Sequence, residues 1–357
     1  MRKKLGFALG AGGARGVAHI GFLQAMDEEG IRPDFISGSS MGSIVGACYA
    51  KGMTPEEMRA IAGKLKAGDI IDFDLMPLTK LGLMKWTKVR RMMSKFLEDC
   101  TFDRLDIPFC CVAVDIKSGK LKTFREGGVV DAVLASSSMP TVFRPVEKDG
   151  MQLIDGSVLC RVPVRQVKHL GAEVVVAVDV LGQCAHVEKV PNVFSLIMRI
   201  YDIMDARSAL EERRRCRHAG DLWLEPDMGE VSQYAVKYYE VAYEAGYQLG
   251  KENAAAIRAL AGIEEGEKRP AQLPAGALQA DKQTDKHKAA AGQSNSHRRP
   301  GDGRPADFGP GELGGYHPLG GRGQLLCPAG PGRFHGGRRN FERRPGGGPS
   351  PVRRRQR

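Results

Sequence analysis

The sequence predicts an α/β fold in which helices cover both faces of a mainly parallel sheet, giving three layers. Short apolar runs alternate with helix-like segments along the chain, which is the order that parallel sheets require. Residues 174–180 form an almost uninterrupted β-branched run, as expected for a central strand buried on both faces. Glycine-rich turns follow the first two predicted strands.

The first part of the chain justifies this prediction element by element. Residues 5–9 are predicted as a short buried strand, and a helix is expected from about 17 to 29, closed by a glycine at position 30. A second strand at 34–37 leads into a tight turn and a small-residue helix at 43–49. Strand, glycine loop, helix, strand and turn in this order are typical of a parallel sheet.

Residues 54–105 are expected to be helical. Thr54, Pro55 and Glu57 predict a helix start with an N-cap, a first-turn proline and a capping box. Residues 70–96 are dense in apolar groups and predict either a wall or lid over an apolar trough, or ordinary core. These groups are Ile70, Ile71, Phe73, Leu75, Met76, Leu81, Leu83, Met84 and Trp86.

The basic amphipathic stretch 86–96 has two interpretations. It could lie on an anionic membrane surface, or it could be a solvated helix face with a buried stripe, and the second is favoured. Further along, strands are predicted at 109–115, 121–124, 153–156 and 174–180. Helices are predicted at 129–137, 194–217 and 234–260.

Charge and composition divide the chain at residue 262. The formal net charge is +11, and residues 263–357 contribute +9 of it, together with 19 of the 45 glycines and 11 of the 20 prolines. This composition predicts a disordered Gly/Pro/Arg-rich tail. Residues 1–262 are then one nearly neutral domain, which argues against a basic nucleic-acid-binding fold. The tail is read either as an out-of-frame extension or as a basic arm that contacts acidic lipid or nucleic acid.

Several other classes of protein are disfavoured. The chain has no apolar run of about 18 residues that would predict a transmembrane helix. Its N-terminus imitates a signal peptide, but a buried strand entering a glycine loop explains it better. The eight cysteines form no C-x-x-C pair and predict buried free thiols in the cytoplasm. No metal-ligand set emerges, and neither a metal nor a cofactor is expected.

The motif Gly38-x-Ser40-x-Gly42 matches a nucleophile elbow, a strained strand-to-helix turn that exposes a serine. Its place between a predicted strand and a predicted small-residue helix supports this interpretation. The alternative is an ordinary glycine turn with a capping serine.

The glycine loop at residues 10–16 predicts backbone N–H donors for a developing oxyanion. A dinucleotide-binding G-x-G-x-x-G fingerprint is the rival interpretation. Gly10 and Gly12 fit it, but Arg15 stands at the third glycine position, where close helix–strand packing is needed. Asp34 follows the glycine loop at nearly the distance expected for an acid that binds a ribose, so the dinucleotide-binding interpretation stays open.

A serine nucleophile needs a base. The four histidines before residue 262, His19, His169, His186 and His218, lie in no local motif and are expected to be structural. Asp155-Gly156 at the end of a predicted strand is the better placed candidate, with an ordinary Asp-Gly turn as the alternative.

Together, the glycine loop with Arg15-Gly16, the elbow at Ser40 and Asp155-Gly156 resemble the bacterial patatin-like phospholipases over roughly residues 5–255. This family shares its fold with plant patatins and the catalytic domain of neuropathy target esterase. The resemblance implies a Ser–Asp dyad without histidine, an oxyanion hole from the glycine loop and hydrolysis of acyl esters of lipids.

Carried over by position, Ser40 is the nucleophile and Asp155 is its base and leaving-group acid. Gly12 and Gly13 would donate N–H groups to the oxyanion, and Arg15 would support their loop. The chain departs from the family pattern at Ser157, where glycine or alanine is usual. It departs again at Cys160-Arg161, where asparagine is common. Both departures concern the fine geometry around Asp155.

The sequence thus predicts a cytoplasmic or membrane-peripheral serine hydrolase that cleaves phospholipid, lysophospholipid or related acyl esters through an acyl-enzyme. An acyltransferase or thioesterase with the same nucleophile is the alternative enzyme. A catalytically weak regulatory protein of the same fold is the non-enzyme alternative. The expected partners are a lipid or acyl-ester substrate and a membrane surface, with no specific nucleic acid. The sequence leaves the oligomeric state open.

Overall fold

The computed structural model describes residues 1–264 except 66, 71, 73–81, 185 and 230–237. The predicted tail therefore lies almost wholly outside the described residues, and the boundary at 262 stays a prediction. The apolar residues Ile71, Phe73, Leu75, Met76 and Leu81 of the predicted wall also lie outside them.

The centre of the molecule is an eight-stranded sheet with the order β10-β9-β1-β2-β4-β8-β7 and with β5 also paired to β4. The neighbours from β10 to β4 are parallel, and β5, β7 and β8 are antiparallel to the strands they join. The predicted mainly parallel α/β class is therefore confirmed. The strands are β1 (Leu5–Leu9), β2 (Phe35–Ser39), β4 (Phe109–Asp115), β5 (Lys120–Phe124), β7 (Val146–Lys148), β8 (Met151–Asp155), β9 (Val174–Val178) and β10 (Leu222–Leu224).

The helices follow the predicted order, except that the helix at residues 164–170 was not predicted. They are α1 (Ala18–Glu28), α2 (Met41–Lys51), α3 (Pro55–Ala62), α4 (Ala67–Ile70), α5 (Thr87–Leu97), α6 (Val129–Ser136), α7 (Val164–Leu170), α8 (Val193–His218) and α9 (Tyr239–Ala261). The predicted capping box is confirmed, because the Thr54 side chain accepts from the Glu57 N–H and the Glu57 side chain accepts from the Thr54 N–H.

The helical prediction for residues 54–105 is wrong in one place. A short strand, β3 (Gly82–Met84), pairs in parallel with β6 (Thr141–Phe143) and forms a separate two-stranded sheet. The partner strand β6 is about 60 residues away along the chain, so no local sequence pattern could predict this pairing.

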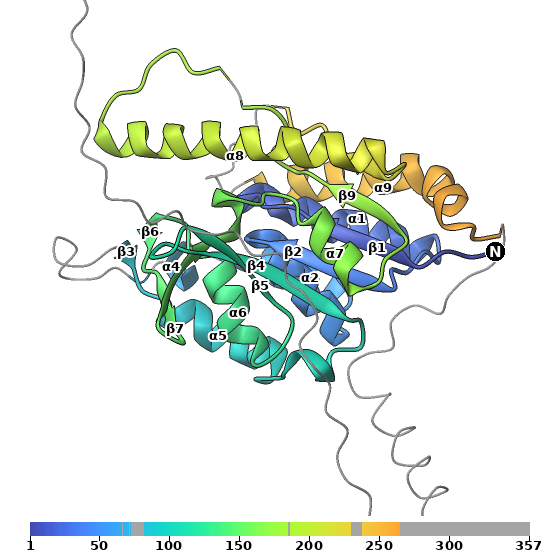
Figure 1. Ribbon diagram of the computed structural model, residues 1–357, viewed down its shortest axis with the longest axis horizontal. Coiled ribbons are helices and arrows are strands. Elements are labelled where there is room, and N and C mark those ends of the chain that lie inside the picture. The colour runs from blue at the N-terminus through green and yellow to red at the C-terminus, as the bar shows by residue number, and fades with distance from the viewer. Residues whose placement is uncertain (66, 71, 73–81, 185, 230–237, 265–357) are drawn as a thin grey trace, which may run out of the picture. The chain divides into compact units, whose positions relative to one another are not determined.

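Side chains alternate between two apolar layers on the faces of the sheet. In β1, Leu5, Phe7 and Leu9 face a large core shared with α1, α2, α5, α6 and α9. Ala8 faces the opposite, smaller core, which contains residues of α7 and α8. α8 and the α5–α6 pair lie on opposite sides of the sheet (Figure 1). This arrangement gives the three layers that the sequence predicts.

One edge of β4 brings two strand ends together. β2 pairs with residues 109–112 of β4, and β8 pairs with residues 113–115. β5 pairs with residues 111–115 and so overlaps both sets. Because a strand has only two edges, β2 and β8 share the edge opposite β5. β2 ends with Ser39 opposite Val112, and β8 ends with Asp155 opposite Ala113. The two strands therefore finish against each other at adjacent positions of β4.

Candidate active site

Ser40 occupies a sharp turn between β2 and α2. Its backbone has φ 51° and ψ −125°, a left-handed conformation that costs energy in a non-glycine residue. A Cβ atom at Gly38 would lie 2.5 Å from the Ser43 Cα, and one at Gly42 would lie 2.2 Å from the Leu9 carbonyl oxygen. The turn therefore has the strain and the glycine requirement of a nucleophile elbow.

The Ser40 hydroxyl donates a hydrogen bond of 2.6 Å to Asp155 Oδ2. Asp155 is fully buried, and its second oxygen, Oδ1, accepts from the Ser157 N–H at 2.9 Å and the Ser157 hydroxyl at 2.7 Å. A Cβ at Gly156 would lie 2.3 Å from the Val112 carbonyl oxygen. The glycine thus lets the end of β8 lie close against β4. The sequence departure at Ser157 adds its hydroxyl as a further donor to the carboxylate, beside the backbone N–H that any residue would supply.

Burial raises the pKa of Asp155 to about 6, and the hydrogen bonds from Ser40 and Ser157 oppose that rise. A buried carboxylate is a stronger proton acceptor than an exposed one, because its charged form is less well solvated. Asp155 is therefore a carboxylate that is ionised at neutral pH and still basic enough to take a proton from the Ser40 hydroxyl.

A serine-rich segment at the end of α6 holds both residues. The Ser40 N–H donates to the Ser136 hydroxyl at 3.1 Å, and the Ser137 hydroxyl donates to the Ser40 carbonyl at 3.2 Å. The Asp155 N–H donates to the Ser138 carbonyl at 2.9 Å. This segment gave no catalytic signal in the sequence, because its role depends on contacts with residues far along the chain.

The glycine loop after β1 lies against the elbow. A Cβ at Gly42 would approach the Gly10 carbonyl as well as that of Leu9, and a Cβ at Gly12 would lie 2.3 Å from the Val180 side chain. Gly13 has φ 51°. The N–H groups of Gly12 and Gly13 donate to no acceptor among the described residues, so both remain available to a ligand beside the elbow.

His19 and Arg15 hold this loop from two sides. His19 is completely buried, and its Nε2 lies 2.8 Å from the Gly10 carbonyl. Because a carbonyl can only accept, Nε2 carries the proton. Burial lowers the pKa of His19 to about 4, so the ring is neutral at neutral pH. The Arg15 guanidinium donates to the Leu181 carbonyl at 3.2 Å, which ties the loop to the chain after β9.

Arg161 is a buried arginine whose place in the site the sequence did not indicate. Its guanidinium pairs with Asp179 at 2.7 Å and with Asp205 of α8 at 3.4 Å. Its carbonyl accepts from the Ala11 N–H of the glycine loop at 3.0 Å. Arg161 therefore joins the glycine loop, the end of β9 and α8. Its partners lie 18 and 44 residues away, a spacing that no local motif records.

No histidine within the described residues hydrogen-bonds to Ser40 or Asp155, and the same residues contain no cluster of three or more potential metal ligands. The described cysteines are free, and most are buried. No described helix is long and apolar enough to cross a membrane.

An apolar cavity of about 130 Å³ adjoins the elbow. It lies between the glycine loop, α2, α3 and α5, and Met41, next to Ser40, forms part of its wall. Five methionines line it: Met41, Met53, Met58, Met92 and Met93. Of the predicted wall segment 70–96, the cavity includes Met92, Met93 and Phe96. Trp86 instead stacks on Phe143 at 4.1 Å.

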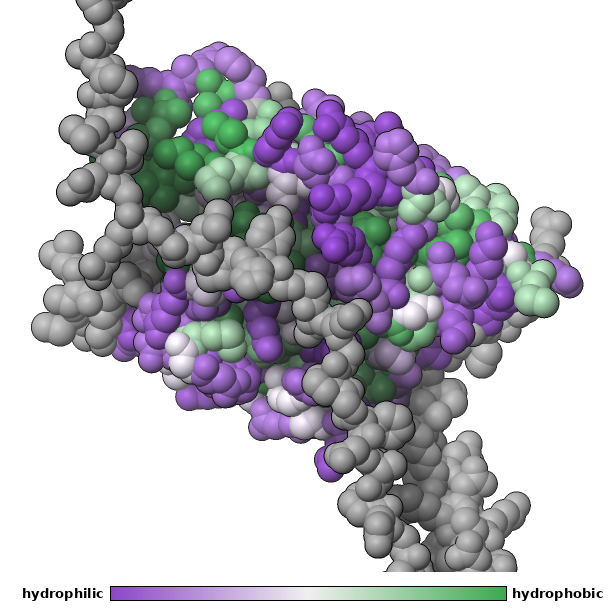
Figure 2. Space-filling view, viewed as in Figure 1, coloured by the Kyte–Doolittle hydropathy of each residue, from purple (hydrophilic) through white to green (hydrophobic). Residues whose placement is uncertain are grey.

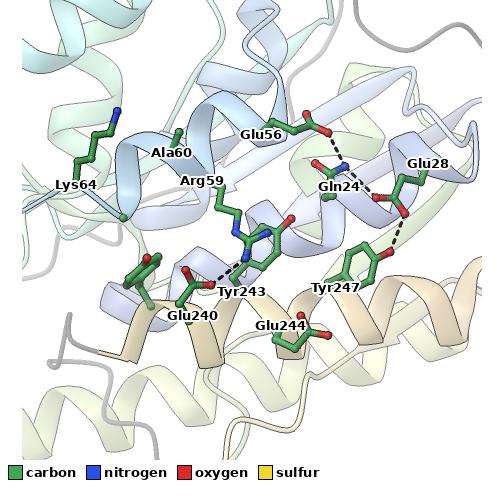
Figure 3. A pocket seen from close by; sticks show the side chains of 12 residues that line it. Gln24, Glu28, Glu56, Arg59, Ala60, Lys64, Glu240, Tyr243, Glu244 and Tyr247 are labelled. Carbon is green, nitrogen blue, oxygen red and sulfur yellow. Dashed lines mark hydrogen bonds and ion pairs between the residues drawn. The ribbon is translucent and has the colours of Figure 1, made fainter.

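A larger groove, of about 680 Å³, lies between α1, α3 and α9 and is lined by neither Ser40 nor Asp155. Its polar side chains are largely paired with one another (Figure 3). Gln24 donates to Glu28 and Glu56, and Arg59 pairs with Glu240. Most of the groove's polar side chains are thus hydrogen-bonded or ion-paired to one another, which is typical of a protein surface rather than of a reactive centre.

The comparisons with known proteins agree with this geometry. Residues 7–168 match the family model described as patatin-like phospholipase. This segment begins in β1 and extends into α7, so it includes the glycine loop, the elbow and Asp155. The match thus gives this part of the chain a likeness to the patatin-like phospholipase family.

Individual relatives carry related names. The chain is 32% identical over 218 residues to an uncharacterized NTE family protein of Mycobacterium tuberculosis, covering 58% of this chain and 60% of that protein. It is 26% identical over 275 residues to a lysophospholipase nte1 of Emericella nidulans, covering 70% of this chain and 18% of that protein. Among solved structures, VipD from Legionella pneumophila is similar with a TM-score of 0.45 and 13% identity, covering 70% of this chain and 67% of that one. The chain thus spans less than two thirds of the curated relatives' length.

Proposed function

We propose that this protein is a serine acyl hydrolase that cleaves carboxylic ester bonds of lipids such as phospholipids or lysophospholipids. The observation that carries the proposal is the 2.6 Å hydrogen bond from the strained, elbow-mounted Ser40 to the buried Asp155. The likeness to a phospholipase family and the apolar cavity beside the elbow favour a lipid as the acyl donor.

In the proposed reaction, the Ser40 oxygen attacks the ester carbonyl while its proton passes to Asp155. The N–H groups of Gly12 and Gly13 stabilise the oxyanion that forms. Asp155 then gives the proton to the departing alcohol, leaving an acyl group on Ser40. A water molecule attacks this acyl-enzyme with Asp155 again as the base, which releases the fatty acid and restores Ser40.

The methionine-lined cavity is the proposed site of the acyl chain. Its wall includes Ala14 and Val17 from the glycine-loop side and Met41 from the elbow side, so a chain entering it would place its carbonyl near Ser40. Methionine side chains adapt to ligands of different shape. The cavity is small as it stands, and chain entry requires these side chains to rearrange.

Hydrolysis assays on purified full-length protein test this function. The substrates are p-nitrophenyl esters of increasing chain length and a panel of phospholipids and lysophospholipids. We expect hydrolysis by the wild type and by Ser118→Ala, whose hydroxyl bonds to Asp115 away from the site, and none above background by Ser40→Ala or Asp155→Asn. A folded wild type that hydrolyses no member of either panel contradicts the proposal.

A further inference from the structure

The first half of α8 presents an apolar surface to solvent. Between residues 193 and 210, nine residues are exposed, and the only charged one among them is Arg207. The other eight are large apolar side chains, each between 39% and 72% exposed: Val193, Phe194, Leu196, Ile197, Ile200, Ile203, Met204 and Leu210. These eight make up more than half of the large hydrophobic residues that the described part of the chain exposes.

This surface is on the opposite side of the helix from its core contacts. Met198, Asp205 and Ala209 are buried against the body of the protein, and these positions fall on one side of an α-helix. A surface helix normally carries polar residues on its other side. Here the outward side is apolar over about three turns, and Figure 2 shows the corresponding hydrophobic area at one end of α8 and hydrophilic surface along the rest.

The inward side of the same helix contacts the surroundings of the candidate active site. On the same helix, the Tyr201 hydroxyl hydrogen-bonds to the Ser157 hydroxyl, which itself donates to Asp155. Asp205 pairs with Arg161, and Met198 accepts from the Thr141 hydroxyl at 3.7 Å. A partner bound to the outward side would therefore contact the helix whose inward side holds Ser157 and Arg161.

The charges around the surface identify the partner. Arg207 is exposed and Arg199 is half-buried, and neither forms an ion pair with a described residue. In the second half of the helix, Arg214 pairs with Glu211 and Arg215 with Glu212, and Arg217 is exposed.

The acids within residues 193–210 are the half-buried Asp202 and the buried Asp205, which pairs with Arg161, so the same surface of a second copy would offer Arg207 no exposed acid. An anionic lipid surface instead receives both the apolar side chains and the arginines.

We propose that the outward side of α8, residues 193–210, seats this protein on an anionic phospholipid membrane. The apolar side chains enter the boundary between headgroups and acyl chains, and the arginines lie against the lipid phosphates. This docking deepens the proposed lipid hydrolysis, on which it rests, because it would bring the protein to the membrane that contains the lipid ester.

Vesicle flotation of the full chain tests this docking. The vesicles are phosphatidylcholine alone or mixed with phosphatidylglycerol, and the variant is Ile200→Glu combined with Ile203→Glu. We expect about tenfold or greater loss of binding to the mixed vesicles, because two half-exposed isoleucines no longer enter the lipid. Ile116→Glu is the matched control, since Ile116 is 53% exposed and Ile203 is 52% exposed; it should bind as the wild type does.

A second variant guards against a folding defect in the first. Arg207→Gln should bind mixed vesicles roughly fivefold more weakly and leave the already weaker binding to phosphatidylcholine unchanged. Hydrolysis of soluble p-nitrophenyl butyrate should stay at the wild-type rate in all variants, which separates docking from the chemistry at Ser40. Flotation itself needs no turnover, so it decides the docking even if no ester is cleaved.

The docking is wrong if the wild type does not float with mixed vesicles or if the double variant floats as well as Ile116→Glu. It is also wrong if light scattering shows a wild-type dimer that the double variant converts to a monomer while vesicle binding stays unchanged. In that case, the surface is an interface between copies.

Discussion

The Ser40 hydroxyl lies 2.6 Å from Asp155 Oδ2. The two residues meet because β2, which ends just before Ser40, and β8, which ends at Asp155, finish next to each other on one edge of β4. Ser39 faces Val112 and Asp155 faces Ala113, so the pairing of two strands to a third determines the distance between the two side chains. Asp155 is joined through the backbone N–H to Ser138, and Ser40 is joined to Ser136. The dyad geometry is therefore a property of the sheet and of the end of α6.

The pH dependence of hydrolysis should follow the ionisation of Asp155. Only the ionised carboxylate can accept the Ser40 proton, and burial raises its pKa to about 6. We therefore expect kcat/KM to fall as the pH falls, with a midpoint at about pH 6. A midpoint near pH 4, as for an exposed aspartate, would contradict the proposed base.

Removing the Ser157 hydroxyl should move this midpoint. The hydroxyl donates to Asp155 Oδ1 and opposes the rise of its pKa, so Ser157→Ala should shift the acidic limb upward by roughly half a pH unit to one unit. Ser118→Ala is the matched control, because Ser118 makes the same kind of bond to Asp115 away from the site. An unmoved limb in Ser157→Ala would show that Asp155 does not govern the profile.

The strain at Ser40 should appear as a stability difference between two inactive variants. Both Ser40→Ala and Ser40→Gly lose the hydroxyl, but only glycine relaxes a backbone at φ 51°. We expect Ser40→Gly to be more stable than Ser40→Ala by about 1 kcal/mol in denaturant unfolding. Equal stabilities, or a more stable alanine variant, would contradict a strained elbow.

Arg161 should be important for stability. Replacing it with methionine leaves Asp179 and Asp205 buried without their cation, a change that typically costs about 3–5 kcal/mol. Burial already raises the pKa of both carboxyl groups, so they can take up protons at low pH. The loss measured by urea unfolding should therefore be greater at pH 8 than at pH 5.

A surface pair provides the comparison for Arg161. Arg59 and Glu240 form an exposed ion pair, and exposed pairs contribute at most about 1 kcal/mol. Arg59→Met should lower the free energy of unfolding by no more than that amount. Similar losses in the two variants would mean that Arg161 has no special structural role.

The predicted tail can be tested by truncation after Gly262. α9 ends at Ala261, whose carbonyl accepts from the Lys3 N–H, and Gly262 caps the helix with φ 64°. We expect residues 1–262 to fold and to hydrolyse esters at the full-length rate. Loss of folding or of hydrolysis on truncation would show that the tail belongs to the functional unit.

Local patterns were sufficient to predict most of the fold. The capping box at Thr54, the β-branched run of β9 and the glycine turn at Ser40 each lie within a few consecutive residues, and the structure has the corresponding helix start, strand and turn. The three-residue strands β3, β6, β7 and β10 and the short helix α7 were not predicted. The partner of β3, for example, is β6, which is remote in the sequence. Hydrogen bonding in such strands depends on tertiary position rather than on propensity.

The candidate site likewise contains residues that short motifs predict and residues that they do not. The positions of Ser40 and Asp155 were suggested by short motifs, whereas Arg161 and the serines of α6 act through contacts across 18 to about 100 residues. For residues 86–96 the favoured interpretation was a solvated helix face with a buried stripe, and the burial of Val89, Met93 and Leu97 of α5 agrees with it rather than with the membrane alternative. The exposed apolar surface is on α8, whose long sequence alone does not reveal which side meets the core.

Labelling with a fluorophosphonate probe tests the central claim most directly. The probe forms a covalent bond with an activated serine, and tryptic mass spectrometry then locates the modified residue. We predict modification of the wild type at Ser40 alone, no modification of Ser40→Ala, and much slower modification of Asp155→Asn. A folded wild type that remains unmodified, or one modified at another serine while Ser40 stays free, would contradict the account.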